Sequence, residues 1–224
     1  MPLAIFDLDN TLLSGDSDYL WGQYLCDLGV VDREHYEACN LRFYEDYRQG
    51  RLDILAFLAF SLRPLAENDP ADLARWRAEF IDQRIRPLIG ESARELVASH
   101  RQAGDTLLII TATNSFVTRP IAELFGIEHL IATEPEQRDG RFTGRVSGTP
   151  AFREGKVERL QAWLRETGQD LRGSSFYSDS HNDLPLLQQV DRPVAVDPDP
   201  ALRAHAERVG WPIISLHQDA SSAA

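Results

Sequence analysis

Short apolar runs that stop abruptly at polar residues recur along the chain. Four of them, at residues 3–6, 106–110, 174–178 and 193–196, lead into Asp-Leu-Asp-Asn-Thr, Thr-Ala-Thr-Asn-Ser, Asp-Ser-His-Asn-Asp and Asp-Pro-Asp-Pro. Apolar runs of this length, bounded by polar residues, are typical of strands buried on both faces of a sheet. The pattern therefore predicts four strands, each with a polar cluster at its carboxyl end.

Segments with helical periodicity separate these strands. Apolar residues recur at helical spacing in residues 116–125, 156–167 and 200–209. Strands that alternate with helices predict an α/β fold, with an open Rossmann-like parallel sheet flanked by helices. Because ligands of such sheets bind beyond the carboxyl ends of the strands, we expect all four polar clusters to converge on one crevice.

A long helical segment lies between the first two predicted strands. Residues 7–105 separate them, and a single crossover helix needs far fewer. Residues 16–86 are rich in Leu, Ala, Arg, Glu and aromatic residues, with apolar positions at helical spacing. We therefore predict a Rossmann-like core at residues 1–15 and 87–224, with an all-helical cap domain inserted at residues 16–86.

Three local features complete the organisation. Residues 134–146 place an Asp-Gly pair between two alternating segments, which predicts a hairpin with a two-residue turn. Cys26 and Cys39 lie in predicted helices without Cys-x-x-Cys spacing, so we expect buried free thiols. The tail at residues 219–224 is small and polar, and we expect it to fray.

The overall charge limits the classes of partner. The 224 residues include 35 acidic and 23 basic side chains, which gives a net charge of −12. This field repels nucleic acids and anionic membranes, so we expect neither as a partner. The N-terminus lacks a basic leader, and the longest apolar stretch, near residues 54–62, is too short to cross a bilayer. These features predict a soluble cytoplasmic protein, and they leave its oligomeric state open.

Acidic residues dominate two of the polar clusters. Asp7 and Asp9 follow the first strand, and their side chains share one side if the backbone stays extended. Two carboxylates so close remain ionised only if a cation or hydrogen bonds offset their repulsion, and oxygen ligands suit Mg²⁺. Asp179 and Asp183 follow a later strand and could complete such a site. Alternatively, each Asp only begins a helix or forms a turn, but their joint pattern favours chemistry.

Four motifs then appear in a familiar order. They are Asp7-Leu-Asp-Asn-Thr-Leu-Leu, Thr111 closing Leu-Leu-Ile-Ile-Thr, Lys156 in Glu-Gly-Lys-Val-Glu-Arg-Leu, and Asp179-Ser-His-Asn-Asp183. Together they resemble the four signatures of the haloacid dehalogenase superfamily over essentially the whole chain. The helical cap and the hairpin are similar to those of its phosphoserine phosphatase-like branch. The resemblance implies a phosphatase that acts on a small-molecule phosphomonoester.

The resemblance also implies roles for the motif residues. Asp7 would be the nucleophile that forms an aspartyl phosphate, and Asp9 the acid and base. An acid at position 9 favours phosphate chemistry over dehalogenation, because a halide leaves without a proton. Thr111 and Lys156 would hold phosphoryl oxygens. The implied cofactor is Mg²⁺, bound by the Asp7 carboxylate, the Asp9 carbonyl, Asp179 and waters, with Asp183 orienting these ligands.

The cap should select the leaving group. Asp16 stands where phosphoserine phosphatases place an acid that pairs with the substrate amine, although it could equally be a helix N-cap. Asn182 matches a residue that contacts the active site in phosphoserine phosphatases, although it could equally be a helix cap. A substrate carboxylate would need an arginine, for which Arg48, Arg51 and Arg63 are candidates.

The fourth motif narrows the substrate. Ser178-Asp179-Ser180 stands where phosphoserine phosphatases have Gly-Asp-Gly, and the longer string Tyr-Ser-Asp-Ser-His-Asn-Asp-Leu-Pro resembles bacterial hydrolases, some of which act on histidinol phosphate. We therefore expect histidinol phosphate or another small amino-alcohol phosphate first, and phosphoserine second. The remaining alternatives are phosphoryl transfer to another acceptor and a catalytically silent binding or scaffold protein.

Overall fold

Strand β1 (Leu3–Phe6) lies inside a seven-stranded sheet in the computed structural model, which describes residues 1–217. The strand order is β4-β3-β2-β1-β5-β6-β7. The other strands are β2 (Thr106–Asn114), β3 (His129–Arg138), β4 (Arg141–Ser147), β5 (Ser175–Ser178), β6 (Arg192–Val196) and β7 (Ile213–Ile214). All neighbouring strands are parallel except the β3–β4 pair. The predicted α/β fold and its four strands are confirmed, and the predicted frayed tail lies outside the described residues.

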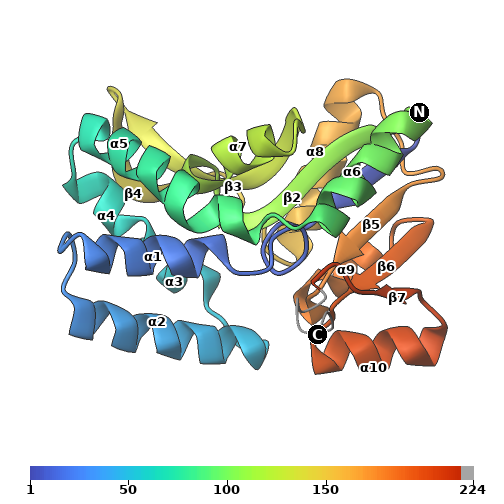
Figure 1. Cartoon of the computed structure of the whole chain (residues 1–224), viewed down its shortest axis with the longest axis horizontal. Helices are drawn as coiled ribbons and strands as arrows, with labels where there is room; N and C mark the ends of the chain where they lie inside the picture. The colour runs from blue at the N-terminus through green and yellow to red at the C-terminus, as the bar shows by residue number, and fades with distance from the viewer. Residues whose placement is uncertain (218–224) are drawn as a thin grey trace, which may run out of the picture.

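The central strand is buried on both faces, as its unbroken apolar sequence requires. Ala4 and Phe6 join one hydrophobic cluster, and Leu3 and Ile5 join a second on the opposite face. Helices α6 (Glu91–Ala103) and α7 (Ser115–Leu124) cover the first face. Helices α8 (Glu154–Thr167), α9 (Leu184–Leu187) and α10 (Pro200–Val209) cover the second (Figure 1).

Every element between β1 and α6 is helical. These elements are α1 (Ser17–Asp27), α2 (Arg33–Arg48), α3 (Ile54–Ser61), α4 (Arg63–Glu67), α5 (Pro70–Phe80), a π-helical turn (Ile81–Ile85) and a 3₁₀ turn (Arg86–Leu88). An Asp side chain accepts from backbone N–H groups at the start of α1, α2, α3 and α5, which explains where these helices begin. Below, "cap" denotes this helical segment, and its boundaries as a domain stay a prediction.

The predicted hairpin joins β3 to β4. Asp139 and Gly140 both have positive φ, 50° and 75°, as a two-residue turn of this hand requires. The hairpin packs on the cap, since a Cβ built on Gly144 would lie 3.3 Å from the Ala66 side chain. Strand β3 begins earlier than the hairpin pattern showed, because its first half pairs with β2 inside the sheet.

Two expectations about the helices have different outcomes. Cys26 is buried in α1, but Cys39 is only partly buried, because α2 is a polar helix with few buried residues. The expectation of two buried thiols was therefore wrong for Cys39. Among residues 1–217, no helix combines the length and the apolar character that crossing a bilayer requires. The cytoplasmic location stays a prediction.

Candidate active site

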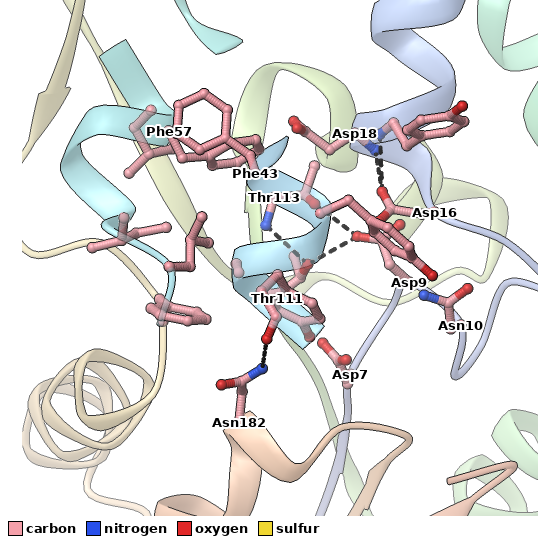
Figure 2. Close-up of a pocket in the computed structure, with 18 of the residues that line it drawn as sticks. Asp7, Asp9, Asn10, Asp16, Asp18, Phe43, Phe57, Thr111, Thr113 and Asn182 are labelled. Carbon is pink, nitrogen blue, oxygen red and sulfur yellow. Dashed lines mark hydrogen bonds between the residues drawn. The ribbon is translucent and has the colours of Figure 1, made fainter. Parts of the chain in front are cut away.

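A cavity at the carboxyl ends of β1 and β2 is closed over by the cap. Its core side is lined by Asp7, Asp9, Thr111, Thr113, Phe152, Lys156, Asn182 and Asp183. Its cap side is lined mainly by Asp16, Asp18, Asn40, Phe43, Tyr44, Tyr47 and Phe57. Figure 2 shows Phe43 and Phe57 across the cavity from Asp7. The strand ends thus bring together residues far apart in the sequence, as the α/β pattern predicted.

The polar cluster after β6 does not join this cavity. Asp197 turns its carboxylate to the backbone N–H groups of Leu216 and His217, at 2.8 and 3.2 Å. Asp199 accepts hydrogen bonds from the backbone and the ring of His181. The expectation that all four clusters converge was therefore wrong for this one, because its carboxylates hold neighbouring loops.

Lys156, in the first turn of α8, connects two buried carboxylates. Its Nζ lies 2.9 Å from Asp7 Oδ1 and 2.8 Å from the Asp183 carboxylate, which also accepts from Ser178 Oγ at 2.7 Å. Burial raises the pKa of Asp7 to about 7, against the opposing charge of Lys156. Burial lowers the pKa of Lys156, but the charges of Asp183 and Asp7 outweigh this and hold it above its ordinary value.

Asp9 points toward the cap and β2 rather than toward Lys156. Its carboxylate accepts from Ser17 N and Thr113 Oγ1, each at 2.7 Å, and from Thr111 Oγ1 at 3.4 Å. Burial raises the pKa of Asp9 to about 6, the charge of Asp16 adds to this, and the hydrogen bonds oppose it. A carboxyl group with this pKa can give and take a proton near neutral pH.

The sequence analysis missed Thr113. It lies two residues after Thr111 on β2, so both side chains project to the same side, where both reach Asp9 (Figure 2). The strand was expected to end before these threonines, but it continues to Asn114. The alternation Thr-Ala-Thr was the available signal.

Asp179 is held beside the Asp7 loop by Thr11. The Thr11 hydroxyl donates to Asp179 Oδ1 and accepts from Asp179 N, both at 3.0 Å. Burial raises the pKa of Asp179 well above its ordinary value, and the charges of Asp7 and Asp183 add to this. These carboxylates therefore share one electrostatic environment.

The atoms predicted to bind the metal, from Asp7, Asp179 and the Asp9 carbonyl, are all oxygens, which suits Mg²⁺. A divalent cation would also relieve the repulsion that raises their pKa values. Within residues 1–217, no three His, Cys, Asp or Glu side chains form a group that could hold a metal by themselves. The predicted set of two carboxylates and the Asp9 carbonyl contains only two such side chains, so this absence does not contradict it, and its oxygen atoms suit Mg²⁺.

Asp16 begins helix α1 and also lines the cavity, while its contact with a substrate amine stays a prediction. One carboxylate oxygen accepts from Asp18 N and Tyr19 N, each at 2.9 Å, so it is the N-cap of α1. The same residue lines the cavity. Burial raises the pKa of Asp16, against the two backbone hydrogen bonds.

Asp18 is a further carboxylate of the cavity, which the sequence analysis did not assign to the site. Its hydrogen bond from Asn114 Nδ2 is long, at 3.4 Å. Burial raises the pKa of Asp18 to about 8, and the charges of Asp16 and Asp9 add to this. The cap side of the cavity is thus strongly acidic.

Asn182 lines the cavity and is not the N-cap of its 3₁₀ turn, His181–Asp183, because Ser180 holds that position. None of the three candidate arginines lines the cavity. Arg51 pairs with Asp46, Arg63 pairs with Glu67, and the exposed Arg48 lies over the ring of Tyr44, which itself lines the cavity. Among the described residues that line the cavity, Lys156 is the only Lys or Arg.

The chain is similar to a known family of hydrolases over most of its length. Residues 4–188 match the model of the haloacid dehalogenase-like hydrolases. The chain belongs to this family. The family resemblance of the four motifs is therefore confirmed, and so is the phosphatase class, since curated relatives are phosphatases.

Two relatives of this hydrolase are named for different phosphatase activities. It is 50% identical to a histidinol-phosphatase of Neisseria meningitidis over 96% of this chain and 98% of the relative. It is 32% identical to the phosphoserine phosphatase SerB1 of Mycobacterium tuberculosis over 94% of this chain and 69% of the relative.

Solved structures agree with the fold of this hydrolase. A Bordetella pertussis protein of unknown function is 48% identical, with a TM-score of 0.91 over 96% of this chain and 99% of that one. A substrate-bound phosphoserine phosphatase has a TM-score of 0.72 at 18% identity, over 97% of this chain and 94% of that one. The second similarity shows the fold alone.

Proposed function

We propose that this hydrolase removes phosphate from a small cationic amino-alcohol phosphate, with histidinol phosphate as the first candidate, in a Mg²⁺-dependent reaction. The observation that carries the proposal is the composition of the cap side of the cavity. Asp16, Asp18, Phe43 and Phe57 all line this side, and no Arg lines the cavity within the described residues. Carboxylates and aromatic faces attract cations.

The chemistry proposed for the core side uses two acids in sequence. Asp7 attacks phosphorus, the bond to the ester oxygen breaks, and Asp9 gives its proton to the leaving alkoxide. Asp9 then takes a proton from water as that water attacks the aspartyl phosphate on Asp7. Inorganic phosphate leaves, and Asp9 is protonated again.

Other side chains position the phosphoryl group. Lys156 holds the Asp7 carboxylate at 2.9 Å and is placed to neutralise phosphoryl oxygens. Thr111, three residues before the end of β2, supplies a hydroxyl donor. Mg²⁺, held by Asp7, Asp179 and the Asp9 carbonyl, would neutralise phosphate charge when bound. Asp183, which bonds to Lys156 and Ser178, orients these groups.

Phosphoserine is the second candidate, because SerB1 is a relative. Its carboxylate would need a cationic partner in the cavity. The only lining Lys or Arg in the described chain is Lys156, which already bonds to Asp7 and Asp183. This favours a substrate with an amine and no carboxylate.

A substrate panel with and without Mg²⁺ tests the proposal. We expect kcat/KM for histidinol phosphate to exceed that for phosphoserine by about 100-fold or more, because a site without a partner rejects a buried charge. Activity should vanish on chelation and in Asp7→Asn. Acid-quenched protein incubated with ³²P-labelled substrate should carry label that Asp7→Asn lacks. A preference for phosphoserine would contradict the proposed substrate. No turnover of any phosphomonoester would contradict the proposed phosphatase function.

A further inference from the structure

Arg153, at the start of α8, bridges the core and the cap. Its Nε donates to Asn182 Oδ1 at 2.9 Å, and its Nη2 donates to the backbone carbonyl of Gly50, just after α2, at 2.5 Å. The guanidinium lies 5.0 Å from the centre of the Phe152 ring. One side chain therefore holds a cavity residue and the cap together.

The cap approaches the core closely around this bridge. Tyr47 Oη donates to Ser180 Oγ at 2.9 Å. Gly50 has φ of 66°, and a Cβ built on it would lie 3.1 Å from Arg153 Nη2 and 3.4 Å from His181 Nε2. The end of α2 thus sits directly on the loop that leads from Asp179 to Asp183.

Arg153 also determines which way the Asn182 amide faces. A guanidinium only donates hydrogen bonds, so its partner on Asn182 must be the amide oxygen. The amide nitrogen is consequently turned away from Arg153. Its contacts with Tyr47 O and Ser180 Oγ are long, at 3.5 and 3.4 Å, so both of its hydrogens remain available to a stronger acceptor (Figure 2). A phosphate oxygen in the cavity is such an acceptor.

The backbone of Arg153 supports a functional reason for this residue. Its φ of 51° and ψ of −120° lie in a region that L residues rarely adopt. Strained residues of this kind cluster at sites where the conformation serves a function. Here the conformation places Arg153 where its guanidinium group reaches both Gly50 and Asn182.

We propose that Arg153 is a positioning residue that couples closure of the cap over the cavity to the orientation of the Asn182 amide. The inference rests on the proposed function only in that the Asn182 amide donates to the substrate. When the cap end at Gly50 reaches the guanidinium, the cavity is closed and the amide nitrogen faces the bound phosphate ester.

The test compares Arg153→Met and Arg153→Lys with Arg165→Met, an exposed arginine on the same helix. We expect Arg153→Met to raise KM for histidinol phosphate about 10-fold or more, with a smaller change in kcat, because closure and substrate binding are linked. Arg153→Lys should not return KM to the wild-type value, since a single ammonium group cannot reproduce the two hydrogen bonds of the planar guanidinium. Arg165→Met should behave as wild type.

Trypsin cleavage after Arg51 gives a readout that needs no substrate. Release of the α2 end should make this cleavage about 5-fold faster in Arg153→Met than in wild type or Arg165→Met. Wild-type KM and cleavage rate in Arg153→Met would overturn the inference. An unchanged KM with a lower kcat and a lower Tm would also overturn it, as a structural role alone. A wild-type protein without phosphatase activity would overturn the proposed function, and the cleavage rates would still decide whether Arg153 closes the cap.

Discussion

Lys156 Nζ donates to Asp7 Oδ1 at 2.9 Å, and this contact joins residues 149 positions apart. The ammonium also lies 2.8 Å from Asp183, so one cation holds two carboxylates that would otherwise repel each other in a buried site. The proposed nucleophile is thereby kept in one orientation. We therefore expect this contact to affect both catalysis and stability.

Lys156→Met should lower kcat about 100-fold or more, because a donor to the phosphoryl group is lost. It should also destabilise the protein by roughly 3–5 kcal/mol at neutral pH, since two buried carboxylates lose their cation. The pKa of Asp7 would rise further above its wild-type value of about 7, so the missing stability grows as pH increases above about 7. Tm measured against pH in EDTA checks this, with Lys156→Arg as the charge-retaining control. An equal Tm deficit at pH 4 and pH 8 would contradict it.

Thr113→Val removes a 2.7 Å hydrogen bond to Asp9 that lowers the pKa of this carboxyl. The pKa of Asp9 should therefore rise above about 6. The limb of the kcat/KM profile that reports its deprotonation should move to higher pH by about one unit. Thr113→Ser keeps the hydroxyl and should keep the wild-type profile. Identical profiles for the valine and serine variants would show that the bond does not tune Asp9.

The N-cap role of Asp16 can be separated from its proposed contact with the substrate amine. Asp16→Asn keeps an N-cap side chain for α1 but removes the charge, whereas Asp16→Ala removes both. Both should weaken kcat/KM for histidinol phosphate more than for p-nitrophenyl phosphate. Only the alanine variant should lose about 1 kcal/mol of stability in a denaturant titration. Equal losses for the two substrates would argue against an amine contact.

Asp18→Asn should stabilise the folded protein at high pH and weaken its activity on the cationic substrate. Burial and like charges raise the pKa of Asp18 to about 8, so its contribution favours the folded state at low pH and is lost as pH rises from about 4 to 8. The asparagine variant should therefore be more stable than wild type at pH 8, by about 1–3 kcal/mol, and equal to it near pH 4.

Above pH 8, where Asp18 is ionised, the same substitution should lower kcat/KM for histidinol phosphate about 10-fold, while that for glycerol phosphate, which carries no cation, changes little. Paired Tm and kinetic measurements check both effects. A variant that is no more stable than wild type at pH 8 would show that Asp18 is not strained by its charge.

Local patterns in the sequence predicted much of the fold and many residues of the cavity. The apolar run at β1 favoured a strand buried on both faces, and the Asp-Gly pair at residues 139–140 favoured a tight turn. Asp7, Asp9, Thr111, Lys156 and Asn182 do line one cavity. Side chains at the carboxyl ends of parallel strands meet because of the topology, which alternation alone predicts.

The sequence by itself determined the α/β class, the helical insertion and the residues of the four motifs, because these depend on neighbours along the chain. Only the tertiary structure decided that Thr113 reaches Asp9, that Asp18 faces the cavity, that Asp197 does not, and that Arg153 meets Gly50 across 103 positions. Such pairings depend on how helices and strands pack, and a short-range pattern does not encode the packing of distant segments.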